Sequence, residues 1–167
     1  MRITVLLALV LATVAGAGDI ITGECSSCGY AVGDVFYGRG FYPYSLALLY
    51  SSHELGEVLE VEFDFVRRLA DHLGVEPPAG GMMDNEAFVF EHQAEYDALF
   101  NGWSPPEHLA DLAGSDGLPP AWVRVYGLPD TDPVPGDAAL MYPDSGPQVC
   151  PHCGGETLEF EMVGCWD

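Results

Sequence analysis

The chain contains no lysine, and its five arginines face 26 aspartates and glutamates, so that its 167 residues carry a formal charge of −21. Lys and Arg are needed to displace the counterions of nucleic-acid phosphates, and their scarcity excludes affinity through the phosphate backbone. Hydrophobic residues nevertheless make up 49% of the chain, which argues against disorder. A chain of this length buries enough surface to fold as one compact domain without covalent staples.

The acid excess itself has two interpretations. A surface of Asp and Glu keeps a protein soluble and monomeric through self-repulsion, and it can also meet a basic partner protein. We expect a monomer whose partner, if it has one, is another protein.

Long apolar runs are also scarce. After residue 17, no stretch approaches the length of a transmembrane helix, so we expect no membrane span in the mature chain. Before it, Arg2 precedes an apolar run from Ile3 to Ala15, and small residues follow up to Ala17. These are the three parts of a secretory leader, and cleavage after Ala17 would export a domain of residues 18–167. If the run is instead a buried segment, or the start codon lies too far upstream, we expect a cytoplasmic protein.

The middle of the chain is predicted to be helical. Ser51 and Glu54 have the spacing of a capping box, and apolar residues at intervals of three and four predict a helix from about His53 to Leu73. A second amphipathic segment lies around residues 96–100, and residues 87–91 before it fit a short strand equally well. The run Ser104-Pro105-Pro106-Glu107 predicts the start of another helix, which stops at Gly114.

The two ends are predicted to be strand-rich. Residues 20–37 contain β-branched and aromatic runs around turn signals, and Pro43 argues against a regular strand through residues 41–50. Short strands are also expected at residues 122–126, 138–142 and 158–162.

Two short motifs carry the chemistry. Cys25-Ser26-Ser27-Cys28-Gly29 (the first knuckle) and Cys150-Pro151-His152-Cys153-Gly154 (the second knuckle) are both CxxCG. Two cysteines separated by two residues can chelate one ion from a tight turn, and the glycine permits a positive φ that lets backbone amides point at the sulfurs. Together the knuckles predict a tetrahedral shell made of Cys25, Cys28, Cys150 and Cys153. Zinc is the expected metal, with iron as the rarer occupant.

These residues resemble zinc-ribbon proteins, in particular small bacterial ones with a double CxxCG motif. The resemblance rests on Cys25 to Tyr30, on the glycine-punctuated aromatic stretch from Gly38 to Tyr44, and on Cys150 to Gly154, a small part of the chain. It implies one structural zinc ion and a non-catalytic role. Some double-CxxCG proteins act as immunity partners of toxins, a role that an acidic surface would suit.

The cysteines also have other interpretations. An exported chain enters an oxidising compartment, where four cysteines could form two disulfides in three different connectivities. Cys-Pro-His-Cys is the active-site sequence of an exported thiol oxidase of the thioredoxin class, in which Cys150 and Cys153 would be the redox pair. That motif normally opens a long helix, whereas strand-like residues follow it here. Cys165 is the odd cysteine, and we expect a free thiol near a frayed end.

The remaining candidate ligands are weak. His92 and Glu95 have a spacing that places two ligands on one helical face, but a solvated surface is the simpler interpretation in so acidic a chain. Asp130, Asp132 and Asp137 lack the spacing of a calcium loop and indicate a plain turn.

The sequence as a whole predicts an α+β fold. In it, a zinc-ribbon-like antiparallel sheet formed by both chain ends carries a helical insertion at about residues 51–114. The predicted function is a non-catalytic zinc-binding protein that acts as an acidic protein-interaction module. The alternative is an exported disulfide-bonded or thiol-redox protein using Cys150 and Cys153.

Overall fold

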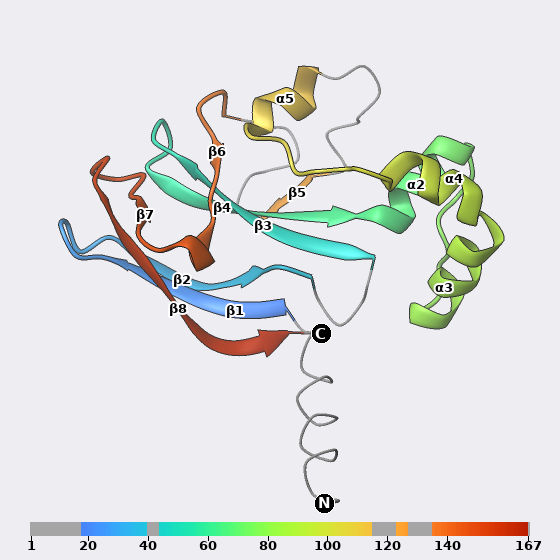
Figure 1. The fold of residues 1–167 in the computed structure, drawn as a ribbon, viewed down its shortest axis with the longest axis horizontal. Coiled ribbons are helices and arrows are strands. Elements are labelled where there is room, and N and C mark those ends of the chain that lie inside the picture. Colours follow the sequence, from blue (N-terminus) through green and yellow to red (C-terminus); the bar gives the residue numbers. More distant parts are fainter. Residues whose placement is uncertain (1–17, 40–43, 115–122, 127–134, 167) are drawn as a thin grey trace, which may run out of the picture.

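The computed structural model describes residues 18–39, 44–114, 123–126 and 135–166, which form two four-stranded antiparallel sheets and several helices (Figure 1). In chain order the elements are β1 (Gly18–Cys25), β2 (Ala31–Tyr37), β3 (Ser45–Ser52), β4 (Glu57–Asp64), α2 (Phe65–Leu73), α3 (Met82–Glu91), α4 (Gln93–Phe100), α5 (Leu109–Gly114), β5 (Val123–Tyr126), β6 (Ala139–Leu140), the 3₁₀ turn η2 (Pro143–Ser145), β7 (Gln148–Val149) and β8 (Glu156–Trp166). The expected α+β class is confirmed.

The first sheet joins the two ends of the chain. Its strand order is β2-β1-β8-β7, and β1 pairs with β8 from Gly18 opposite Trp166 to Cys25 opposite Leu158. Strands from opposite ends of the sequence therefore lie side by side, as expected. The pairing brings the last residue of β1, Cys25, close to the second knuckle.

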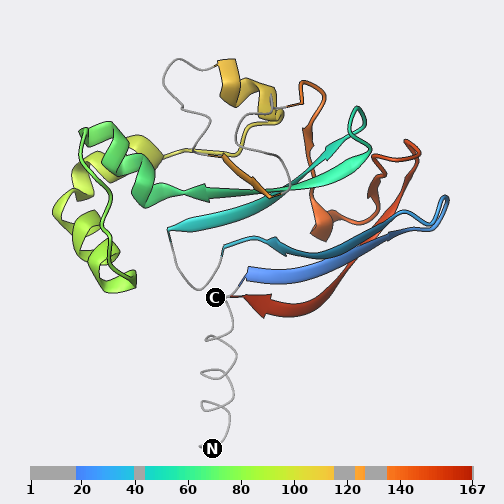
Figure 2. The same cartoon turned by 180° about the vertical axis from the view of Figure 1, so that it is seen from behind.

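The second sheet has the strand order β5-β4-β3-β6 and packs against the first (Figure 2). Helices α2, α3 and α4 gather at one end of this sheet, and α5 lies above it. Leu49 of β3 and Met141 share a buried cluster with Ile21 and Leu158 of the first sheet. Burial of these apolar side chains between the layers is the main force that holds the two sheets together.

The expectation of one helix from about His53 to Leu73 is wrong in its first part. Residues Glu57–Asp64 form strand β4, which is joined to β3 by a tight turn with Gly56 at φ 71°. The reason is a period-two pattern, in which the buried side chains of Leu59, Val61 and Phe63 alternate with glutamates. The helix begins only at Phe65, where Asp64 caps it by accepting hydrogen bonds from two backbone N–H groups.

Ser51 and Glu54 consequently form no capping box. The segment expected as a helical insertion, residues 51–114, contains helices α2 to α5 but also strand β4. Pro43 precedes strand β3 and does not prevent it, because β3 begins two residues later at Ser45.

Two other boundaries differ from expectation. Residues 87–91 belong to helix α3, so the strand alternative is wrong there. Helix α5 ends at Gly114 as expected but begins at Leu109 rather than next to Ser104. The preceding residues are instead tied to the second sheet, because the carbonyl of Pro106 accepts a hydrogen bond from the Tyr50 hydroxyl and that of Glu107 accepts one from the Leu140 N–H. The strands expected at residues 122–126, 138–142 and 158–162 correspond to β5, β6 and β8.

The expected leader, residues 1–17, lies outside the described residues, and its assignment stays a prediction. Among the helices that the structure describes, none is both long and apolar enough to span a bilayer.

A buried carboxylate links the two sheets. Glu60 of β4 is only 6% exposed, and its Oε2 accepts a hydrogen bond of 2.8 Å from the backbone N–H of Phe36 on the edge strand β2. Burial raises the pKa of Glu60, and this outweighs the opposing effect of the Phe36 hydrogen bond. The ionised side chain therefore covers an otherwise open strand edge at a cost in desolvation.

This linkage predicts a pH-dependent effect of Glu60→Gln. The pKa of Glu60 is higher in the folded than in the unfolded protein. Its contribution to stability is therefore fully present below the unfolded-state pKa of about 4.3, and it is lost as the pH rises through the folded-state pKa. An amide oxygen can still accept from Phe36 without that penalty. We therefore expect the melting temperature of the variant, relative to wild type, to rise from pH 4 to pH 7, as measured by thermal unfolding at each pH. Glu57→Gln, an exposed change on the same strand, should show no such rise in relative melting temperature. An equal rise in both variants would contradict the role given to the burial of Glu60.

Candidate metal centre

Each knuckle is a tight turn at the end of a strand. In the first, Cys25 donates its N–H to the carbonyl of Tyr30 (2.8 Å), and Gly29 donates to the carbonyl of Cys25 (2.9 Å). The second repeats this arrangement, since Cys150 donates to Gly155 and Gly154 donates to Cys150, both at 2.8 Å. The trailing glycines have nearly the same φ, 72° at Gly29 and 74° at Gly154. The CxxCG motif therefore specifies the same backbone twice, as expected.

The knuckles bring four sulfur atoms together. The Sγ atoms of Cys25, Cys28, Cys150 and Cys153 all lie within 4.8 Å of one another. Cys25 Sγ is 3.7 Å from Cys153 Sγ, and Cys28 Sγ is 3.8 Å from Cys150 Sγ. A tetrahedral zinc ion with Zn–S bonds of about 2.3 Å requires sulfurs about 3.8 Å apart. The four cysteines are thus positioned to bind one metal ion.

The same distances argue against disulfides in this arrangement. A disulfide needs its sulfurs about 2.05 Å apart, and all five cysteines of the chain are free. The redox alternative also lacks its structural context, because Cys153 is followed by a turn and strand β8 rather than by a helix. Cys165 lies on β8 opposite Asp19, exposed and outside the cluster.

The thiols of the sulfur cluster differ in pKa. A hydrogen bond from the Thr157 hydroxyl, 3.2 Å away, is the largest influence on Cys25 and lowers its thiol pKa to about 6. At Cys28 the backbone N–H of Tyr30 lowers the pKa, but desolvation and the three neighbouring thiols outweigh it and raise the value to about 12. Desolvation also raises the pKa of Cys150. Gathering four thiolates without a cation is unfavourable, and a divalent ion relieves their repulsion.

Residues of the second sheet support both knuckles. The hydroxyl oxygen of Tyr30 accepts a hydrogen bond of 3.0 Å from the backbone N–H of Val58, and the Tyr30 ring stacks on His152 at a centroid distance of 5.9 Å. His53, in the turn between β3 and β4, lies with Nδ1 2.5 Å from the carbonyl oxygen of Pro151. His152 is exposed and serves this stack rather than the sulfur cluster.

The other candidate ligands do not assemble. Among the described residues, only the four cysteines form a group of three or more potential ligands close enough to share an ion. His92 lies at the junction of α3 and α4, so that His92 and Glu95 do not share one continuous helix. Asp130 and Asp132 fall outside the described residues, and Asp137 lies in a turn, where its carboxylate accepts hydrogen bonds from Ser52 and Glu54.

Two residues that contact the knuckles could not be identified from the sequence. Thr157 lies three positions after the second knuckle, and strand pairing alone places it beside Cys25. His53 was expected on a helix and reaches the second knuckle only because its segment is a β-turn. No local sequence signal marks either contact.

Comparison with protein-family models, with curated proteins and with solved structures finds no match for this chain. Its class is therefore defined by fold and site alone: an α+β protein in which a four-cysteine cluster, suited to one metal ion, joins the two ends of the chain.

The left-handed turn conformation predicts a specific effect of Gly29→Ala. A Cβ at Gly29 would meet nothing within 4 Å, so the change tests backbone conformation alone. A non-glycine residue at this φ costs about 1–2 kcal/mol, and we expect a loss of unfolding free energy of this size in chemical denaturation. Gly33→Ala, at an equally open position without a positive φ, should change it by less than about 0.5 kcal/mol. Equal effects of the two changes would contradict the assignment.

Proposed function

We propose that this chain is a non-catalytic zinc-binding protein. One structural zinc ion is held by Cys25, Cys28, Cys150 and Cys153 and joins the first and last strands of the fold. The observation that carries the proposal is the sulfur spacing of 3.7 and 3.8 Å, which matches the edge of a zinc–thiolate tetrahedron.

The ligand set favours zinc and a structural role. Four thiolates are soft donors that select zinc or iron over magnesium or calcium. Four protein ligands also fill a tetrahedral shell and leave no position for a catalytic water. The free energy of metal binding then contributes directly to folding, because the two knuckles are 121 residues apart and converge only in the folded chain.

We further propose that the fold serves as an acidic protein-interaction module. This part of the proposal is supported by the charge of −21, which attracts basic partners and speeds their association. We expect the protein to act as a monomer, exported if residues 1–17 are a true leader.

Elemental analysis of protein purified under reducing conditions, without added chelator, tests the metal assignment. We expect one zinc per chain, with bound iron as the less frequent outcome. Native mass spectrometry of the same sample gives the metal-bound mass, and N-terminal sequencing shows whether the chain starts at Gly18. A metal-free chain whose mass shows hydrogens lost to two disulfides would overturn the metal assignment.

A further inference from the structure

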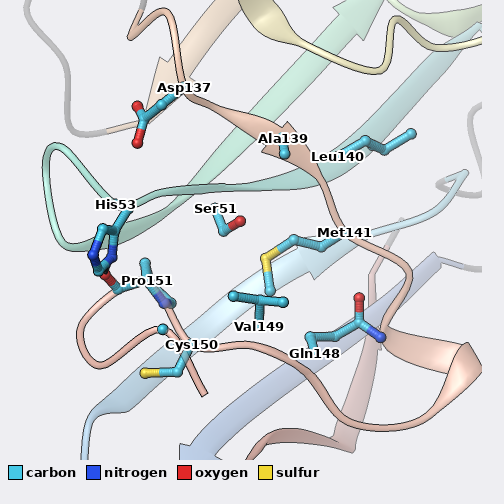
Figure 3. A pocket seen from close by; sticks show the side chains of 11 residues that line it. Ser51, His53, Asp137, Ala139, Leu140, Met141, Gln148, Val149, Cys150 and Pro151 are labelled. Carbon is cyan, nitrogen blue, oxygen red and sulfur yellow. Dashed lines mark hydrogen bonds between the residues drawn. The ribbon is translucent and has the colours of Figure 1, made fainter. Parts of the chain in front are cut away.

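A cavity of about 440 Å³ lies beside the second knuckle, between strands β6 and β7, which are edge strands of different sheets (Figure 3). Its lining is largely apolar: Ala139, Leu140 and Val149 are at least partly exposed, whereas Met141 and Pro151 are buried. Val149 is 47% exposed and lines the cavity. The cavity thus offers apolar surface that this chain itself leaves uncovered.

One end of the cavity is anionic. Asp137 and His53 line this end, away from Gln148. The Asp137 carboxylate is fixed by hydrogen bonds from the Ser52 hydroxyl (2.9 Å) and the Glu54 N–H (2.7 Å). Desolvation acts to raise the pKa of Asp137, but these hydrogen bonds outweigh it and hold the pKa below its usual value, so that the group is ionised at neutral pH.

The described lining of the cavity contains neither lysine nor arginine, and His53 is the one basic side chain in it. The chain as a whole contains no lysine. With a net charge of −21, the protein also raises the local concentration of cationic ligands around it. A cationic group from another molecule would complement the charge of Asp137.

We propose that this cavity accepts a lysine or arginine side chain from a basic segment of a partner protein. The aliphatic stem lies on Val149, and the cationic head reaches Asp137. Long cationic side chains combine these two properties, because their methylene groups cover apolar surface while the head pairs with a carboxylate. The inference rests on the proposed interaction role and specifies the partner's chemistry.

The cavity and the metal centre share a wall. Cys150, Pro151 and Gly154 of the second knuckle line the cavity, and His53 contacts the Pro151 carbonyl. Loss of the metal should loosen this wall and weaken binding. The two sites are therefore expected to be coupled, with the zinc-loaded protein as the competent form.

Fluorescence anisotropy with short labelled peptides tests the proposal. The probes carry two arginines, two lysines or two citrullines in one otherwise uncharged sequence, since citrulline keeps the stem but lacks the charge. We expect the zinc-loaded protein to bind the arginine and lysine peptides at least about tenfold more tightly than the citrulline peptide, in keeping with one charge-assisted hydrogen bond.

Matched variants locate the binding. Asp137→Asn should weaken arginine-peptide binding at least about tenfold. Asp34→Asn removes the same charge from an exposed position on β2, at the opposite edge of the first sheet, and should change it less than about twofold. Val149→Ser should also weaken it. Equal effects of Asp137→Asn and Asp34→Asn would show non-specific attraction and overturn the proposal.

Two further readouts separate the remaining outcomes. If Nα-acetyl-arginine amide binds as tightly as the peptide, the occupant is a small molecule and the partner-protein proposal fails. Zinc content and melting temperature are measured on every variant. A wild-type protein that holds one zinc but binds none of the peptides refutes the cavity proposal alone, whereas a protein without metal refutes the proposed function.

Discussion

Replacing Cys25 by serine should remove the bound metal and lower the melting temperature by about 10 °C or more. Structural zinc sites contribute about 10–16 kcal/mol of binding free energy in small peptides, and each kcal/mol shifts the melting temperature of a chain of this size by about 2–4 °C. Cys25 is buried at the end of β1, where it also belongs to the core cluster. A serine hydroxyl is not a thiolate and cannot replace it as a soft ligand. Circular dichroism and elemental analysis measure both quantities on one sample.

Two controls accompany Cys25→Ser: substitution of the cysteine outside the cluster, and removal of the metal by a chelator. Cys165→Ser removes a thiol that lies outside the cluster and should leave zinc content and melting temperature unchanged. A chelator should destabilise wild type to about the level of Cys25→Ser and have no further effect on the variant, because both remove the same ion. A variant that melts like wild type, or additive effects of chelator and substitution, would contradict a shared metal site.

Replacing Leu49 by alanine should destabilise the fold by about 2–5 kcal/mol, the usual cost of such a cavity in a core. Leu49 is fully buried on β3 and packs into the same cluster as Cys25 and Cys150, so it carries the contact between the second sheet and the metal centre. The expected fall in melting temperature is roughly 4–20 °C. Zinc content should stay at one per chain at temperatures below melting, since every ligand is kept.

Leu55→Ala is the matched control for this change. Leu55 lies in the turn after β3 and is 42% exposed, so its truncation should cost less than about 0.5 kcal/mol in denaturant unfolding. Similar costs at both positions would mean that the two sheets do not pack as described. Loss of zinc from folded Leu49→Ala would show that the site depends on sheet packing more directly than its ligands indicate.

The metal-compatible site could be predicted from sequence because it depends on local chemistry. A CxxCG motif encodes its own turn, with two sulfurs on one side and a glycine at positive φ, and Gly29 and Gly154 both adopt that conformation. Two copies at opposite ends then imply that the ends meet, and the pairing of β1 with β8 fulfils this. Spacing was enough to place the two chain ends side by side, but it did not give the strand order of the first sheet.

The second sheet could not be predicted in the same way. The segment from Glu57 to Asp64 fits a helical spacing and a strand alternation together, and pairing with the adjacent β3 and with the distant β5 favours the strand. The apparent cap at Ser51 was misleading for the same reason, because Ser51 lies in β3 and is paired with Val58 of β4 and Ala139 of β6. Contacts of this kind, like that of His53 with Pro151, have no local signature.

X-ray absorption spectroscopy at the zinc edge tests the central claim most directly. We predict a first shell of four sulfur atoms at about 2.3 Å in the wild-type protein and in Cys165→Ser, whereas Cys25→Ser should hold no zinc and give no such signal. A shell containing nitrogen or oxygen in the wild-type protein, or fewer than four sulfurs, would contradict the claim that both knuckles hold one ion.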